Sequence, residues 1–454
     1  MNDERDPRHE EAGEDGKSYP CFLCLWASQT LSLFGSMITQ FAVNVWLVRD
    51  LYPLPSQKPE LAVALTTVGL ASFAPLIIAM PVAGAFADRH DKKRILVASN
   101  AVLALLSVLL VTLSLTHGLS LVPTALILVA YAVATSFHSA AFDSSYGLFV
   151  SEHNLPRAGG LMMTSHALAQ LLAPALAATL VAAPTLMGRP SWLPADLQDG
   201  VPFAFAADGL TFVIALVVVA RLRFPPAPAA PPPTGGILDG VREGFRWILS
   251  RRPFHWLLTT GSFANLTFAP LLLLLPLLAR DRVAADAAAL GMPYEEVLAI
   301  ANIAGGFGGV LGGIAVSLLG LPRMRRTLIM GLSLVVLGLG EVIAGVSTTV
   351  WGLALGMFVG ESLVGPLNTA SYTLWQTLTP PQMLARALAT RRFIAQGAFP
   401  LGTAISGWLA VRAEPWVVVA GSGALMAVFA TVQMLRPGFA TLEDRMRIEA
   451  ERPD

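Results

Sequence analysis

Charged residues are scarce in this chain of 454 residues. They make up 13% of it, whereas apolar residues make up 54% and the mean hydropathy is +0.63. Soluble globular proteins carry about 25% charged residues, so this composition excludes an ordinary water-soluble domain. The formal net charge at pH 7 is +0, which leaves no overall charge to attract nucleic acid or an acidic partner.

Cysteine is nearly absent as well, since Cys21 and Cys24 are the only two. Their C-x-x-C spacing occurs in zinc and redox sites, but two ligands do not complete a zinc site and no soluble domain surrounds them. We interpret the pair as packing residues. The sequence also lacks the phosphate-binding pattern G-x-x-x-x-G-K-[ST], which argues against ATP as an energy source. We therefore expect no metal, no cofactor and no enzymatic activity.

The chain does contain many long apolar runs. About 20 mostly apolar residues can cross a bilayer as a helix, and a helix satisfies its own backbone hydrogen bonds in lipid. The sequence thus predicts an all-α membrane protein. Its twelve predicted spans lie at about 21–48, 61–87, 95–116, 121–148, 159–183, 202–221, 254–279, 295–319, 326–347, 350–376, 388–411 and 415–435.

The predicted spans form two sets of six. The expected divisions are an acidic, disordered cytoplasmic tail at 1–20, a first bundle at 21–221, a linker at 222–253, a second bundle at 254–436 and a cytoplasmic tail at 437–454. The linker opens with the Pro-rich stretch "FPPAPAAPPPTGG", which is typical of an extended spacer. It continues as an amphipathic helix with Leu238, Val241, Phe245 and Ile248 on one face. The polar start and the length of the first run argue against a cleavable signal peptide.

The basic residues predict how the chain sits in the membrane. With both ends on one side, 24 of the thirty Lys and Arg residues lie on that side. Loops rich in Lys and Arg stay in the cytoplasm. The sequence therefore predicts a multi-pass protein of a bacterial-type plasma (inner) membrane with both termini in the cytoplasm.

The two halves also resemble each other. The segment "QLLAPALAATL" (170–180) aligns with "QGAFPLGTAIS" (396–406), so that Gln170 matches Gln396 and Pro174 matches Pro400. Two equivalent six-helix bundles are typical of transporters whose substrate site lies at the repeat interface. Chance similarity between apolar helices is the alternative.

The loop after the second span carries the densest cluster of charge, "GAFADRHDKK" at residues 84–93. This stretch resembles the signature of the major facilitator superfamily, G-x-x-x-D-R-x-G-R-R, in both spacing and location. Asp91 replaces a glycine of the general pattern, as in the branch of macrolide, multidrug and siderophore (enterobactin-type) exporters. The segment "LWQTLTPPQMLARALATRRFIAQ" (374–396) is similar to the same branch. The resemblance covers roughly residues 20 to 436.

The resemblance implies that this loop is part of a gate. Asp88 would cap the eleventh span in one conformation and release it in the other, and Asp143 could receive a basic side chain of the loop. The alternative is a cluster of charges that only sets membrane orientation. The residues assigned to the gate are Gly84, Asp88, Arg89, Lys92, Lys93 and Asp143.

The fifth span contains the pattern A-x-x-x-A-P-x-x-A-A. It is similar to the antiporter motif G-x-x-x-G-P-x-x-G-G of the same superfamily, with alanine at every glycine. The resemblance implies export and a kink around Ala173, Pro174 and Ala177. An ordinary packing face of small residues is the alternative.

Two acidic residues lie deep within predicted spans. Glu361 falls near the middle of span ten, and Glu341 lies in the outer half of span nine. An ionisable group costs about 2.5–3.5 kcal/mol at the centre of a span, so each needs a reason. No Lys or Arg lies mid-span to neutralise them, and we predict that Glu361 and then Glu341 carry protons. Asp208 is expected to be a structural contact at the outer edge.

Several uncharged polar side chains are expected to line a substrate cavity. They are Gln40, Asn44, His166, Gln170, Asn265, Asn302 and Asn368. With apolar neighbours, these groups suit an amphipathic organic molecule. The sequence thus predicts a monomeric exporter of a drug, macrolide or siderophore, driven by protons and in contact with membrane lipids. A lysophospholipid transporter and a non-transporting membrane sensor are the alternatives.

Overall fold

The computed structural model describes residues 19–150, 155–186, 199–225, 237–436 and 439–450, and every regular element in these ranges is a helix. The predicted tail at 1–20 lies almost wholly outside the described residues. The long helices are α1 (Tyr19–Trp46), α2 (Lys58–Arg89), α3 (Lys92–Leu115), α4 (Leu121–Phe149), α5 (Leu155–Leu186), α6 (Val201–Arg221), α8 (Arg252–Leu277), α10 (Tyr294–Leu319), α11 (Arg326–Val346), α12 (Val350–Ser362), α13 (Val364–Leu378), α14 (Pro381–Ala410) and α15 (Pro415–Leu435).

Eleven helical segments of the described chain are long and apolar enough to cross a membrane. They correspond to the predicted spans one to ten and twelve. The eleventh predicted span lies in α14, which packs beside α8 and α2 like the others. Its first half is less apolar because it carries Arg391, Arg392 and Gln396.

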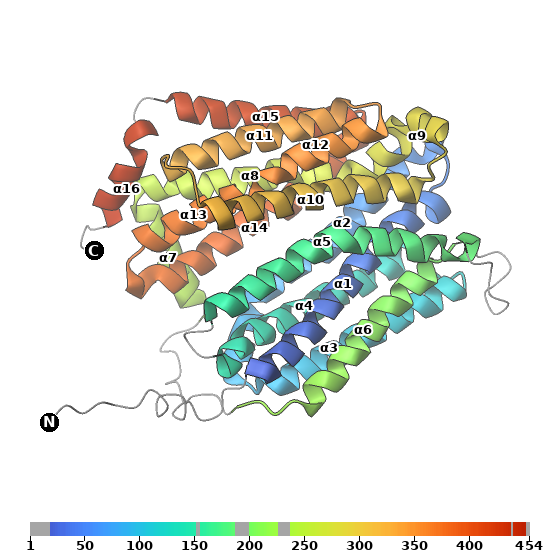
Figure 1. Ribbon diagram of the computed structural model, residues 1–454, viewed down its shortest axis with the longest axis horizontal. Helices are drawn as coiled ribbons and strands as arrows, with labels where there is room; N and C mark the ends of the chain where they lie inside the picture. Colours follow the sequence, from blue (N-terminus) through green and yellow to red (C-terminus); the bar gives the residue numbers. More distant parts are fainter. Residues whose placement is uncertain (1–18, 151–154, 187–198, 226–236, 437–438, 451–454) are drawn as a thin grey trace.

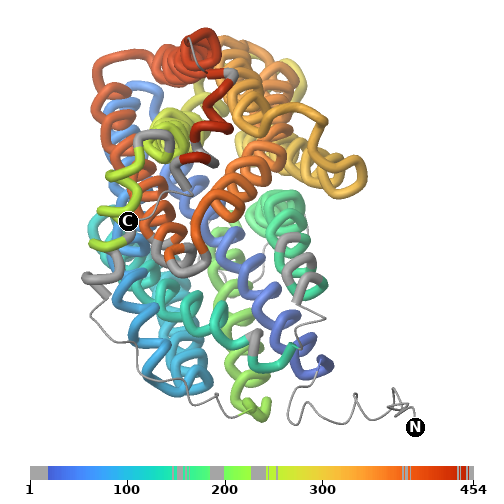
Figure 2. Tube along the Cα trace, turned by 90° about the vertical axis from the view of Figure 1, so that its left-hand side faces the viewer, coloured from blue at the N-terminus to red at the C-terminus, as the bar shows by residue number. Residues whose placement is uncertain are grey.

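The helices form two bundles (Figure 1). Helices α1 to α6 make up the first half and α8 to α15 the second, and Figure 2 views the same pair turned by 90°. Helix α1 begins and α15 ends on the same side of the molecule, which also carries the short helices α7 (Ile237–Ser250) and α16 (Leu442–Ala450). We call this the terminal side and the opposite one the distal side.

The two short helices on the terminal side are packed against the second half. In α7, which occupies the linker, Trp247 and Ile248 are buried and Phe245 is exposed. In α16, the Glu443 carboxylate accepts a hydrogen bond from the backbone N–H of Arg326 at 3.1 Å. Part of the predicted C-terminal tail is therefore a helix that covers the start of α11.

The tenth span is not the single helix that the sequence predicts. It breaks into α12 and α13 at Leu363, two residues after Glu361. The break lies beside the glycine-rich helix α10, where a Cβ added to Gly308 or Gly312 would overlap the backbone oxygen of Phe358 or Ser362. Such close backbone approach is possible only for glycine, and it brings the broken span directly against α10.

Candidate functional site

The two halves meet along helices α2 and α14, but only over the distal part of their length. A Cβ on Gly407 of α14 would overlap Thr66 of α2, and one on Gly69 would lie 3.2 Å from Thr403. One turn further, the rings of Phe73 and Phe399 meet with centroids 4.9 Å apart. This side of the interface is therefore closely packed.

Toward the terminal side the same helix faces separate. An added Cβ on Gly84 of α2 or on Gly397 of α14 would meet no atom of the described chain within 4 Å. Gln396 and Arg392 continue the face of Phe399 at helical spacing, and both side chains are exposed. The interface is thus closed on the distal side and open on the terminal side.

Helix α5 faces the second half in the same way. Gly306 of α10 is so close to the α5 backbone that an added Cβ would lie 3.0 Å from the carbonyl oxygen of Gln170. His166 lies one turn closer to the terminal side, and the side chains of Gln170 and His166 are exposed. These two predicted cavity residues therefore lie along the edge of the interface where it opens.

Asp143 connects the two halves electrostatically. It is exposed near the terminal end of α4, and the ionisable groups around it include Arg392 in α14 and His166 in α5. Arg89 and Lys92, the basic side chains of the loop that Asp143 could receive, form no bond with it among the described contacts. In this conformation, Asp143 therefore lies in the field of a basic residue of the opposite half.

The remaining residues of the predicted gate lie at the turn between α2 and α3. Asp88 and Arg89 are exposed, and the structure shows no hydrogen bond or ion pair for Asp88 within the ranges it describes. Asp91 accepts a hydrogen bond from the backbone N–H of Arg94 at 2.9 Å and so caps α3. Lys93 donates to the carbonyl of Leu222 at the end of α6. Asp91 and Lys93 therefore fix the turn, while Asp88 is left accessible.

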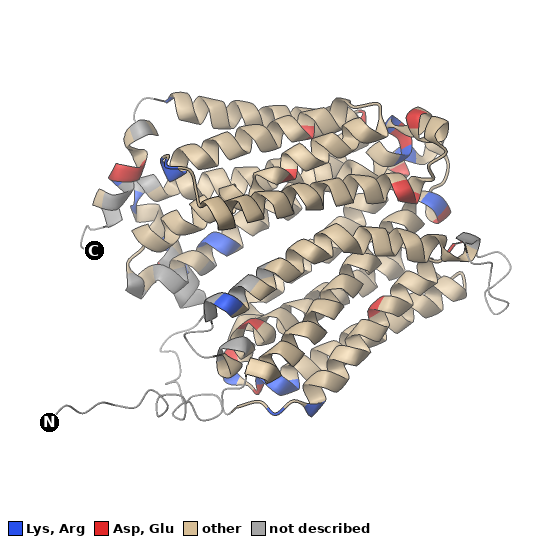
Figure 3. Ribbon diagram, viewed as in Figure 1, with Lys and Arg blue, Asp and Glu red and all other residues tan. Residues whose placement is uncertain are grey.

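Glu361 lies where the tenth span breaks. A Cβ added to Gly305 of α10 would lie 3.3 Å from its Oε1, and one added to Gly309 would lie 3.9 Å from its Oε2. No described side chain donates a hydrogen bond to this carboxyl group or forms an ion pair with it. In Figure 3, Lys and Arg lie toward the two ends of the bundle, so an acid in the middle of a span has no described basic residue beside it. Glu361 is thus an acid within the span that faces a helix surface of glycines.

Glu341 has a different environment in α11. It is 0% exposed, and the hydroxyl of Ser422 in α15 donates a 3.2 Å hydrogen bond to its Oε2. Its Oε1 is buried without a partner among the described residues. The adjacent Gly340 is in close contact with Gly360 of α12, so Glu341 and Glu361 lie at the same depth and face opposite sides.

The other predicted cavity residues are less distinctive. Asn265 and Asn302 donate from their side-chain amides to carbonyls of their own helices, at 2.9 and 2.8 Å. Asn302 precedes Gly306 by one turn, so it lies on the face of α10 toward α5. Asn368 of α13 is exposed, and Gln40 and Asn44 of α1 are half-buried.

The proline of the fifth span does not interrupt its helix. Helix α5 is continuous from Leu155 to Leu186 with Pro174 inside it. Ala173 and Ala177 are each 0% exposed. The alanines of the predicted kink therefore form a buried packing face.

Sequence reasoning underestimated Asp208. It is 0% exposed, and its carboxylate accepts hydrogen bonds from the hydroxyls of Thr39, Ser107 and Tyr131 at 3.0, 2.9 and 3.2 Å. These donors come from α1, α3 and α4, so Asp208 of α6 joins four helices. Asp208, near the distal start of α6, is a structural contact as expected, but it is fully buried. The sequence does not show that these hydroxyls surround the acid, because they lie far from it along the chain.

The comparisons with known proteins agree with this architecture. Residues 18–447 match the family described as transmembrane secretion effector. Macrolide efflux protein A of Streptococcus pyogenes is 25% identical over 414 residues, which cover 88% of this chain and 92% of that protein. Enterobactin exporter EntS of Shigella flexneri is 25% identical over 422 residues, 92% of each chain.

The fold is also similar to that of a solved structure. A bacterial homolog to the human lysosomal transporter Spinster, in an inward-facing and unoccupied conformation, superposes with a TM-score of 0.63 at 15% identity. The match covers 96% of this chain and 99% of that one. At this identity the likeness concerns the fold alone.

Proposed function

Since the chain belongs to the transmembrane secretion effector family of the major facilitator superfamily, and is a multi-pass membrane transporter rather than an enzyme, we propose that it exports an amphipathic small molecule in exchange for protons. We place the terminal side in the cytoplasm, because the sequence predicts 24 of the thirty basic residues on the side of the two termini. The substrate enters from that side while the distal side is closed.

Alternating access is supported by the way the two halves touch. Distally, α2 and α14 interlock through Gly407 and Thr66. On the terminal side, Gln396, Gln170 and His166 are accessible. Rocking the two halves about the site between them would close one side and open the other.

The position of Glu361 is the main support for proton coupling. A carboxyl group within the membrane without a basic partner is stable when it is protonated and costly when it is charged. Because it lies against Gly305 and Gly309 of α10, gaining or losing a proton changes the force between the broken span and α10. The neighbouring face of α10 contacts α5 at Gly306, so this change reaches the interface between the halves.

The substrate class is inferred from the relatives and from the open part of the interface. The relatives are named for macrolide efflux and enterobactin export. Asn368 precedes the exposed Tyr372 by one turn of α13, and Gln396 precedes Phe399, whose ring contacts that of Phe73, by one turn of α14. This combination suits a molecule that is largely apolar but offers several hydrogen-bonding groups.

The test uses purified protein in proteoliposomes with an imposed pH gradient. The probes are a labelled macrolide and enterobactin, each in a separate arm. We expect Glu361→Gln to abolish the stimulation by the gradient while substrate exchange without a gradient continues. Glu296→Gln is the matched control, because Glu296 is an exposed acid at the start of α10. Unchanged gradient-driven transport by Glu361→Gln would refute its role.

A further inference from the structure

The first helix of each half ends in the same unusual way. Helix α1 continues into a π-helical turn with the sequence LVRDL (η2, Leu47–Leu51), and α8 continues into one with the sequence LARDR (η5, Leu278–Arg282). Arg49 and Asp50 therefore correspond to Arg280 and Asp281. π-helical turns are rare and occur often at functional sites, and here the repeat preserves both the turn and its Arg-Asp doublet.

Each arginine of this repeat reaches across to the opposite half. The Nη1 of Arg49 lies 3.0 Å from Oε1 of Glu295 at the start of α10. The Nη1 of Arg280 donates to the backbone carbonyl of Tyr52 at 3.0 Å. Residues far apart in the chain are thus joined at the distal side by two reciprocal bonds.

The two bonds differ in how their charges are balanced. Arg280 also forms a paired contact with Asp281, at 2.6 and 2.9 Å, so its charge is neutralised within its own half. In the first doublet the side chain of Asp50 is hydrogen-bonded to Asp199 instead, and Arg49 forms its ion pair with Glu295, whose side chain is only 9% exposed. Separating the halves would leave Glu295 without its cation, whereas Arg280 would keep its carboxylate.

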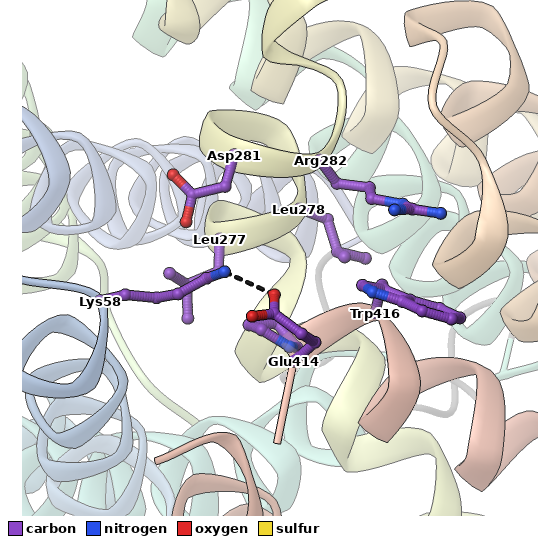
Figure 4. Close-up of a pocket in the computed structure, with 8 residues that line it drawn as sticks. Lys58, Leu277, Leu278, Asp281, Arg282, Glu414 and Trp416 are labelled. Carbon is purple, nitrogen blue, oxygen red and sulfur yellow. Dashed lines mark hydrogen bonds and ion pairs between the residues drawn. The ribbon is translucent and has the colours of Figure 1, made fainter. Parts of the chain in front are cut away.

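A third cross-half contact lies nearby and is more exposed. Lys58 of α2 forms an ion pair of 2.6 Å with Glu414, and the two side chains are 28% and 60% exposed. Figure 4 shows this pair at a cavity of about 150 Å³ with Asp281, Arg282 and Trp416 around it. Exposed ion pairs contribute little because water and salt screen them, so this contact is the weaker one.

We propose that the two Arg-Asp doublets form a latch that holds the distal side closed, and that the bond between Arg49 and Glu295 determines how readily it opens. The proposal rests on the alternating access proposed above. Opening the distal side must break both cross-half bonds, because their partners belong to opposite bundles. The Arg49 bond dominates, since only there are two partly buried charges separated.

The test measures access to the distal interface directly. Thr403 is 2% exposed and packs against Gly69 of α2. In a background with Cys21→Ser and Cys24→Ser, Thr403→Cys reports distal opening by its reaction with a membrane-impermeant maleimide added outside. We expect Glu295→Gln to increase the labelling rate about tenfold, which corresponds to about 1.4 kcal/mol in the opening equilibrium.

Two controls and one rescue define the outcome. Glu296→Gln, an exposed acid next to Glu295, and Glu414→Gln, which breaks the exposed pair, should each change the rate less than twofold. The double variant Arg49→Glu/Glu295→Arg should restore slow labelling, which would attribute the faster labelling of Glu295→Gln to the lost bond rather than to misfolding. Labelling of Glu295→Gln at the parental rate, or no restoration by the exchange, overturns the latch. The assay needs neither substrate nor a proton gradient, so its result is independent of the Glu361 experiment.

Discussion

The hydroxyl of Ser422 donates a hydrogen bond to the carboxyl group of Glu341, and the first half contains the same bond with its partners exchanged. There Ser107 of α3 donates to Asp208 of α6. Helix α3 starts at Lys92 and α11 at Arg326, so that Ser107 and Glu341 occupy the same position in their helices. Asp208 and Ser422 likewise correspond in α6 and α15.

This exchange shows how the repeat preserves an interaction without preserving its residues. In each half one buried acid joins the third helix to the sixth. The surroundings differ, because Asp208 receives three hydroxyl donors and Glu341 receives one. The first acid is therefore satisfied as a hydrogen-bond acceptor, and the second is not.

Removing Asp208 should destabilise the first half. Asp208→Ala leaves the buried hydroxyl of Thr39 without its acceptor, and an unsatisfied buried group costs about 1–3 kcal/mol. We expect the Tm in detergent to fall by roughly 5 °C, as for about 2 kcal/mol in a domain of ~200 residues. Asp208→Asn keeps an acceptor oxygen and should lose less. Equal Tm values for Asp208→Ala and the parent protein would show that the network is not stabilising.

Glu341 should respond in the opposite way. A buried polar group with few partners can be replaced by an apolar group of similar shape at little cost. We expect Glu341→Met to keep the Tm within about 2 °C of the parent. The matched substitution Asp208→Met should lower it clearly. A large loss for Glu341→Met alone would mean that the bond from Ser422 is more important than its surroundings indicate.

Most of the architecture could be predicted from local sequence. Apolar runs and their basic flanks determine where spans lie, and the motif at Gly84 to Lys93 identifies the superfamily. Other features depend on residues distant in the chain. The break at Leu363 follows from the approach of α10, and Arg49 pairs with Glu295 only because two bundles meet. A single sequence shows each partner but not their contact.

The glycines of α10 provide a test of the close approach to the broken span. Gly308→Ala would place a methyl group against the backbone oxygen of Phe358, which cannot move aside as a side chain can. Overpacking of this kind costs about 1–3 kcal/mol, so we expect a lower Tm and reduced yield. Gly313→Ala is the control in the same helix, since no described atom lies within 4 Å of its added Cβ. Alanine is favoured over glycine in a helix by up to about 1 kcal/mol, so we expect an unchanged or higher Tm for Gly313→Ala.

The substitution Gly407→Ala tests the distal contact without changing any charge. Gly407 packs against Thr66 of α2 from the opposite half, so a methyl group there would overlap this side chain while the distal side is closed. Once the halves separate distally, the overlap disappears. Gly407→Ala should therefore favour distal opening and increase the maleimide labelling of the Thr403→Cys reporter severalfold. The change in Tm should be smaller than that for Gly308→Ala.

The control for Gly407 is Gly397→Ala, on the same helix but where the interface is already open. Its added Cβ meets no described atom within 4 Å, so neither labelling nor Tm should change appreciably. A Gly407→Ala variant that labels as slowly as Gly397→Ala would show that Thr66 yields to the methyl group and that the helices need not part. Both substitutions add one methyl group to α14, but only the one at Gly407 contacts Thr66. Faster labelling in Gly407→Ala alone would therefore show that the contact between Gly407 and Thr66 keeps the distal side closed.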